Sequence, residues 1–214
     1  MEILKYPYIL FDLDGTLIDT NELILTSFMH ALNKFHPNKF KREQVQEMMG
    51  KPLYDMMATF DPDIADDLVR VYREHNLEYH DQLVQSFPNV FEVVKELHDK
   101  GHKMALVTTK QRQAAMKGLT LFGLDAYMGA TVCLDDTAAH KPDPEPLILA
   151  MQGIKAIPEK TIMVGDNPAD ILGAKNAGVT SCAVGWSMRG LEYLTQYEPD
   201  YIINDMRELI EIVS

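Results

Sequence analysis

Two aspartates stand one residue apart where an apolar run ends. Asp12 and Asp14 follow the run Tyr8–Phe11 and precede Gly15. Because alternate residues of an extended segment point to the same side, both carboxylates are expected to face one crevice. Carboxylates held close together repel each other unless one is protonated or a cation lies between them. Oxygen ligands of this kind suit Mg²⁺, so the pair indicates a magnesium site, although an ordinary strand-end turn would give the same short pattern.

A second acidic pair follows another apolar run, Thr161–Val164. Asp166 comes just after this run, and Asp170 lies four residues further on, at the expected start of a helix. Residues four apart share one face of a helix, so the two carboxylates can face the same side. Taken alone, Asp170 is equally explained as an acid that interacts favourably with the helix N-terminus.

Between the acidic pairs lie hydroxyl groups and a lysine. Thr108 and Thr109 end the run Met104–Val107, where hydroxyls and the N–H groups of a helix start could bind phosphate oxygens. Threonine at this place is also a common helix N-cap. Lys141 stands in the proline-flanked loop His140–Pro144 and would present a point charge to a phosphate, whereas a solvated surface lysine is the simpler interpretation of that residue alone.

The elements that must position these residues alternate between short apolar runs and amphipathic stretches. The predicted strands are 8–11, 104–107, 130–133, 161–164 and 181–184, and the predicted helices are 89–100, 111–122, 145–153 and 168–177. Gly101, Gly123 and Gly178 follow three of these helices as C′ residues. This alternation predicts an α/β fold, a doubly wound parallel sheet with helices on both faces and with functional loops at the carboxyl ends of its strands.

Residues 17–85 interrupt the alternation, because they contain no convincing strand. Apolar residues recur there at helical spacing, and Pro37, Pro52 and Pro62 separate the helical segments. We therefore predict an α/β core domain of residues 1–16 and 86–214, with residues 17–85 forming an inserted helical bundle.

The composition limits the possible partners. The formal charge is −12, from 32 acidic and 20 basic residues, which argues against nucleic-acid binding through a basic surface. No apolar run approaches the ~20 residues needed to cross a membrane. Without a signal-peptide pattern, and with only two well-separated cysteines, the sequence predicts a cytoplasmic protein. A small anionic substrate would be repelled by the overall charge, so local cations must reverse the field at its site.

Taken together, the motifs resemble the haloacid dehalogenase-like phosphohydrolase superfamily from about Tyr8 to the C-terminus. The family pattern is DxDGT, then Ser or Thr after the second strand, then Lys, then GDxxxD, and all four stand here in that order. The resemblance implies a Rossmann-like core whose helical cap corresponds to the insert.

The resemblance also implies a mechanism. Asp12 would be the nucleophile that forms an aspartyl-phosphate, and Asp14 the acid and base. Mg²⁺ would be held by Asp12, the Asp14 backbone carbonyl and Asp166, with Asp170 as an outer ligand. The phosphoryl oxygens would be bound by Thr108, Thr109 and Lys141.

Substrate choice is expected to reside in the cap. Asn21 and Glu22 follow the first motif, and Lys51 stands in the turn 50–52; Arg112 and Arg189 are further candidates from the core. Within the superfamily, the motifs are most similar to those of enzymes that hydrolyse inorganic pyrophosphate. Phosphoglycolate phosphatases share nearly all of them, though many have Asn where this chain has Thr109. A phosphomutase and a non-catalytic phosphoacceptor domain are further alternatives, although phosphoacceptor domains lack both the helical cap and an acid equivalent to Asp14.

Overall fold

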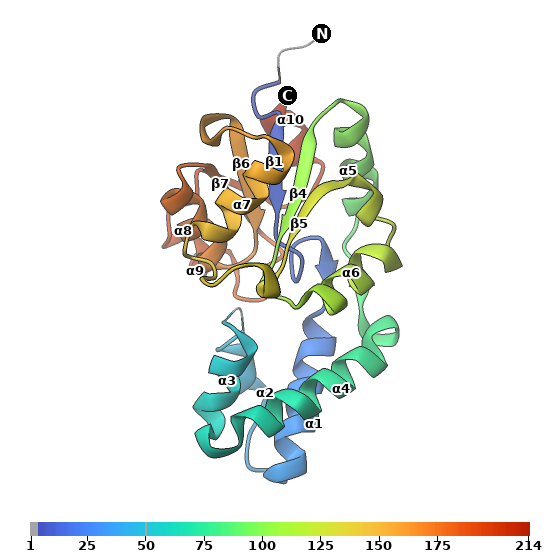
Figure 1. Ribbon diagram of the computed structural model, residues 1–214, viewed down its shortest axis with the longest axis vertical. Helices are drawn as coiled ribbons and strands as arrows, with labels where there is room; N and C mark the ends of the chain where they lie inside the picture. The colour runs from blue at the N-terminus through green and yellow to red at the C-terminus, as the bar shows by residue number, and fades with distance from the viewer. Residues whose placement is uncertain (1–3, 50) are drawn as a thin grey trace. The chain divides into compact units, whose positions relative to one another are not determined.

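The computed structural model describes residues 4–49 and 51–214, which form two compact units (Figure 1). The core unit runs to Asp19 and resumes from Ser86 to Ser214, while the insert is Thr20–Gln85. Leu17, Ile18 and Asp19 belong to the core unit rather than to the predicted insert, and the first two are fully buried apolar residues. Gly50, in the turn that includes Lys51, lies outside the described residues.

A six-stranded parallel sheet forms the centre of the core unit, in the order β5-β4-β1-β6-β7-β8. Its strands are β1 (Tyr8–Phe11), β4 (Lys103–Val107), β5 (Met128–Val132), β6 (Thr161–Gly165), β7 (Thr180–Val184) and β8 (Tyr201–Ile203). The first five match the predicted strands to within two residues at each end. The edge strand β8 was not predicted, because three residues are too few to show an alternating pattern.

Helices cover both faces of this sheet, which confirms the predicted fold class (Figure 1). They are α5 (Val90–Asp99), α6 (Arg112–Leu121), α7 (Glu145–Ile154), α8 (Pro168–Ala177), α9 (Leu191–Thr195) and α10 (Glu208–Val213), with 3₁₀ turns η2 (Asp125–Tyr127), η3 (Leu134–Asp136) and η4 (Pro158–Lys160). Gly101, Gly123 and Gly178 all have positive φ after helices, as a C′ position favours.

Alternating strand residues bury the two faces separately. On one face, Leu10, Val107 and Met163 pack with Leu147 and Ala150 of α7 in a single apolar cluster. Their strand neighbours point the other way and are also buried. A strand that is apolar on both sides is expected in a sheet covered on both faces.

The insert is helical and has an apolar core of its own. It comprises α1 (Asn21–Phe35), α2 (Arg42–Gln46), α3 (Leu53–Phe60), the 3₁₀ turn η1 (Pro62–Ile64) and α4 (Ala65–Leu83). Phe28, Leu32, Met57 and Leu68 are buried together between these helices. At the two ends of the insert, β2 (Ile18–Asp19) pairs with β3 (Gln85–Ser86). None of the helices in the described part of the chain combines the length and apolar character that a membrane crossing needs.

The apolar cluster beneath α7 should dominate the stability of the core. Truncating the fully buried Leu10 in Leu10→Ala is expected to lower the free energy of unfolding by about 2–5 kcal/mol, because a cavity remains where the side chain was. Ile157→Ala is the control, since Ile157 is exposed and should change the value by about 0.5 kcal/mol or less. Urea unfolding measures both, and equal effects would contradict the assignment of Leu10 to the core.

Candidate functional site

Two of the predicted aspartates lie side by side because their strands are neighbours in the sheet. Phe11 of β1 pairs with Val164 of β6, so Asp12 and Asp166 emerge at the same edge. The Asp12 N–H donates to the Val164 carbonyl (2.9 Å), which holds the first turn of the loop against β6. Gly15 has φ +80°, and a Cβ on it would collide with the Asp166 carboxylate. Only glycine allows this turn to approach Asp166 so closely.

Asp170 is positioned by the first turn of α8. Asn167 caps the helix: its side chain accepts from the Ala169 N–H (3.1 Å), and one Asp170 oxygen, Oδ2, accepts from the Asn167 N–H (3.0 Å). This reciprocal capping box satisfies backbone groups at the helix start. It also fixes the carboxylate so that Oδ1 faces Lys141. Position 165 must be glycine, because a Cβ on this residue would collide with the Asp170 side chain.

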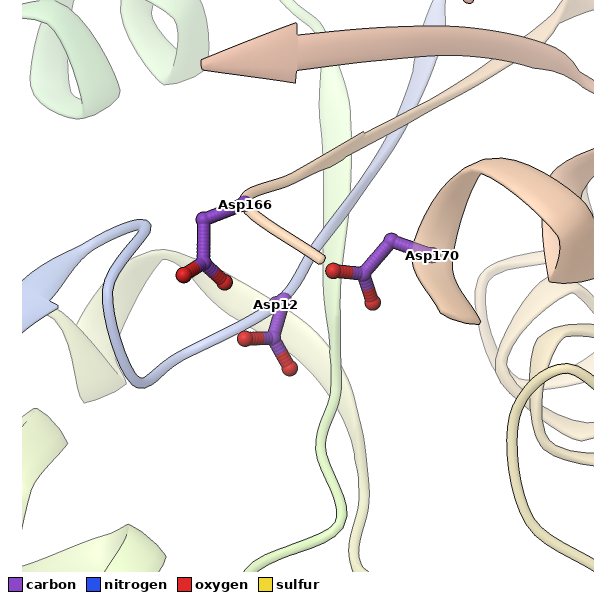
Figure 2. A group of neighbouring side chains, drawn as sticks. All are labelled: Asp12, Asp166 and Asp170. Carbon is purple, nitrogen blue, oxygen red and sulfur yellow. The ribbon is translucent and has the colours of Figure 1, made fainter. Parts of the chain in front are cut away.

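Figure 2 shows the Asp12, Asp166 and Asp170 carboxylates gathered from three segments of the chain. One ligand atom from each lies within 4.8 Å of the others, close enough to hold a single metal ion. Ligands made only of oxygen favour a hard divalent cation. The cluster therefore can serve as a metal site, and its geometry does not select one such cation over another.

A buried lysine pairs with two of these three carboxylates. The Lys141 ammonium donates to Asp12 Oδ1 (2.7 Å), to Asp170 Oδ1 (2.6 Å) and to the Val107 carbonyl (2.8 Å). Its side chain is only 3% exposed. Burial lowers the pKa of Lys141, but the two carboxylates outweigh burial and raise it above its usual value. Lys141 is therefore a permanent cation against Asp12.

Burial raises the pKa of two carboxyl groups in the acidic cluster. It raises the pKa of Asp12 from 3.8 to about 7; Lys141 opposes this shift and the Asp170 carboxylate adds to it. The pKa of Asp166 is also raised well above 3.8, first by burial and then by Asp12 and Asp170. A bound divalent cation would oppose both shifts, because it favours the ionised form of each carboxyl group.

Asp14 lies beside Lys110, a lysine that is not among the predicted site residues. The Lys110 ammonium donates to Asp14 Oδ1 (2.7 Å). Lys110 stands two residues after Thr108, which is buried and accepts from the Lys110 N–H through its hydroxyl (3.2 Å). Thr109, between them, is partly buried. The loop after β4 thus supplies a second cation as well as the predicted hydroxyl groups.

Ser187 is a further residue missed from the sequence. Its hydroxyl donates to the Asp166 backbone carbonyl (2.7 Å) and accepts from the Arg189 N–H (3.3 Å), so the segment after β7 supports the metal-site loop. The Arg189 guanidinium itself lies over the Tyr193 ring, 5.1 Å from its centroid. A serine between a tryptophan and a methionine carries no periodic signal that could have identified this contact.

The remaining candidates from the sequence have other partners or belong to the insert. Arg112 forms an ion pair with Asp136 and donates to the Thr131 carbonyl, so its guanidinium is engaged at the end of β5. Asn21, Glu22 and Lys51 belong to the insert. There Arg42 binds Glu22 with both guanidinium nitrogens and, by hydrogen bonding, lowers the pKa of that carboxyl. Lys51 is exposed.

Comparisons with known proteins agree with this geometry. The family model for haloacid dehalogenase-like hydrolases matches residues 9–184. A protein named pyrophosphatase PpaX from Halalkalibacterium halodurans is 50% identical over 206 residues, which cover 96% of each chain. The protein of the same name from Bacillus mycoides is 44% identical over 211 residues, 99% of this chain and 98% of its own.

Solved structures share the whole fold. A haloacid dehalogenase-like family hydrolase from Streptococcus pneumoniae superposes with a TM-score of 0.87 at 24% identity, covering 97% of this chain and 98% of its own. A protein described as a predicted phosphatase from Clostridium acetobutylicum has a TM-score of 0.86 at 26% identity and 97% coverage of both chains.

Two glycines allow a matched steric test of the metal-site loop. Gly165→Ala is expected to destabilise the protein by about 1–3 kcal/mol and to weaken divalent-cation binding, because the new methyl group displaces Asp170. Gly173→Ala, in α8, should be neutral or stabilising by up to about 1 kcal/mol, since its Cβ would meet neighbours at no less than 3.5 Å. Urea unfolding and calorimetric Mg²⁺ titration measure the two effects. Similar behaviour of both variants would refute the proposed role of Gly165.

The raised pKa of Asp12 predicts how stability varies with pH in metal-free protein. Folded Asp12 holds its proton up to about pH 7, whereas the unfolded carboxyl releases it near 3.8. Its contribution to the free energy of unfolding is therefore present below about pH 4 and is lost as the pH rises to about 7. The stability of the wild type relative to Asp12→Asn should fall across this range, measured by urea unfolding in EDTA, and Mg²⁺ at pH 7 should stabilise the wild type more. A difference that does not vary with pH would contradict the shift.

Proposed function

The chain belongs to the haloacid dehalogenase-like hydrolase family, and from this premise we propose that it hydrolyses inorganic pyrophosphate to phosphate with the help of Mg²⁺. The observation that carries the proposal is the Asp12 carboxylate, held against the Lys141 ammonium at 2.7 Å and beside two further aspartates. The choice of substrate is supported by relatives named pyrophosphatase, with which nearly the whole chain aligns.

In the first step, a carboxylate oxygen of Asp12 attacks phosphorus. A bond forms between that oxygen and phosphorus while the bridging phosphorus–oxygen bond breaks, so that one phosphate leaves and an aspartyl-phosphate remains. Lys141 favours the ionised form of Asp12 that this attack needs, because it lowers the pKa of Asp12 against the effect of burial. Asp14 donates its proton to the leaving oxygen. It then takes a proton from a water molecule that attacks phosphorus, which breaks the bond to Asp12 and releases the second phosphate.

The oxygens of the transferred group need positive partners. Thr108, Thr109 and Lys141 bind them, from the loops that follow β4 and β5. The metal would be held by Asp12, Asp166 and the Asp14 backbone carbonyl, with Asp170 as an outer ligand. When bound, Mg²⁺ neutralises charge between the anionic nucleophile and its anionic substrate.

The insert contributes to substrate selection in this proposal. Lys51 provides a second cation for a doubly charged substrate, and Asn21 and Glu22 begin the first helix of the insert. We also propose a cytoplasmic location, which is supported by Cys133 and Cys182: both are free and buried thiols, as a reducing compartment favours.

A substrate panel tests this function. Phosphate release with Mg²⁺ should be faster for pyrophosphate than for phosphoglycolate, sugar phosphates or nucleotides, and Asp12→Asn should reduce it at least about 1,000-fold, because the attacking group is removed. Asp99→Asn is the control, since Asp99 is an exposed residue that pairs with Lys95 on α5.

The panel tests the identity of the substrate and the reaction mechanism separately. Preference for phosphoglycolate would overturn pyrophosphate as substrate but leave the phosphohydrolase mechanism intact. Full activity of Asp12→Asn would overturn the mechanism. A wild type that takes up phosphate stably, without releasing it, would indicate a phosphoacceptor domain.

A further inference from the structure

Lys110 is a nearly buried cation on a loop that is held in place from both sides. Its side chain is 10% exposed. Its N–H donates to the Thr108 hydroxyl (3.2 Å), and its carbonyl accepts from the Leu134 N–H (3.0 Å). These bonds join the loop after β4 to the segment after β5, so the ammonium is presented from a well-ordered backbone. Withdrawing an ammonium from water is costly, so its burial must be compensated by anionic partners.

The two lysines of the site contact different carboxylates. Lys141 binds Asp12 and Asp170, whereas Lys110 binds Asp14 at 2.7 Å. Positive charge is therefore divided between the attacking carboxylate and the carboxylate assigned to the leaving oxygen. In an in-line displacement, these two oxygens lie on opposite sides of phosphorus. A cation beside Asp14 is thus on the leaving-group side.

We propose that Lys110 is a specificity-determining residue that binds the leaving phosphate of an anhydride substrate. This inference rests on the proposed function, because it takes Asp12 as the nucleophile and Asp14 as the residue at the leaving oxygen. It goes beyond the proposed function because a residue of the core unit, and not only the insert, would distinguish anhydride substrates from ester substrates.

The chemistry of the leaving group explains the discrimination. When the bridging bond of pyrophosphate breaks, its electron pair stays on the departing phosphate, whose negative charge increases. A phosphate ester instead releases an alcohol, which is neutral once it is protonated. A fixed cation at this point therefore stabilises the anhydride transition state more than its ground state and more than the ester transition state. A local cation matters all the more in this protein, because its net charge of −12 repels an anionic substrate and leaving group.

Lys110→Met tests the proposal with two substrates whose leaving groups are similar in basicity but differ in charge. These are pyrophosphate and p-nitrophenyl phosphate. We expect kcat/KM to fall on the order of 100-fold for pyrophosphate, as removal of a charged hydrogen-bond donor predicts, and less than about 5-fold for the ester. Lys110→Arg should keep most of the preference because it keeps the charge. Lys103→Met, an exposed lysine at the opposite end of β4, should change neither value.

Equal losses on both substrates would show that Lys110 only positions Asp14, and no loss on either would remove it from the site; both results overturn the proposal. A binding measurement tests the role of Lys110 even if the proposed pyrophosphatase activity is wrong. With Mg²⁺ present, Kd for methylenediphosphonate, which cannot be hydrolysed, should rise at least about 10-fold in Lys110→Met, while Kd for inorganic phosphate changes less than about 2-fold. An unchanged Kd for the diphosphonate overturns the proposal whether or not the wild type turns over pyrophosphate. Circular dichroism melting of each variant establishes that it is folded.

Discussion

The Lys141 ammonium, buried between the Asp12 and Asp170 carboxylates, is the interaction on which the site depends. Buried charges persist only when their partners and hydrogen bonds are well placed, and removing one partner leaves the others uncompensated. Several structural features serve that placement. The register of β1 and β6 aligns Asp12 with Asp166, the capping box of α8 orients Asp170, and Gly15 and Gly165 leave room for the carboxylates.

Electrostatics then connects this cluster with its chemistry. The chain as a whole is strongly acidic, yet the carboxyl ends of the central strands gather two lysines with low exposure. Lys141 favours the anionic form of Asp12, but burial outweighs it and raises the pKa of Asp12 and Asp166, so a further cation is favourable. The acidic cluster therefore favours a bound cation, which would attract an anionic substrate at short range although the chain as a whole repels it.

The two units have different parts in this scheme. The core unit contains the acidic cluster, both of these lysines and the loop residues around them, all carried by a parallel sheet that is buried on both faces. The insert has its own apolar centre and so can vary in its surface residues without disturbing the sheet. Haloacid dehalogenase-like hydrolases with a common fold can thus differ in substrate, because a fold alone does not determine function.

Much of the fold followed from local pattern. The runs at Tyr8–Phe11 and Thr161–Val164 are strands, and the glycines at 101, 123 and 178 follow helices, because hydrophobic period and backbone freedom are properties of a few consecutive residues. The strand β8 escaped prediction, because three residues are too few to show a period. The order of the acidic pairs, hydroxyls and lysine likewise indicated the chemistry that the chain could carry out.

Contacts between distant segments were decided only by the tertiary structure. A lysine after Thr109 has no local feature that relates it to Asp14, which is 96 residues away in the chain, and Ser187 has none that relates it to the Asp166 carbonyl. Nor does spacing reveal that Lys141 touches Asp12 and Asp170 at once. Sequence determines which groups are present and the element that carries each, whereas distance, burial and the resulting pKa shifts arise only when the sheet register brings separate loops together.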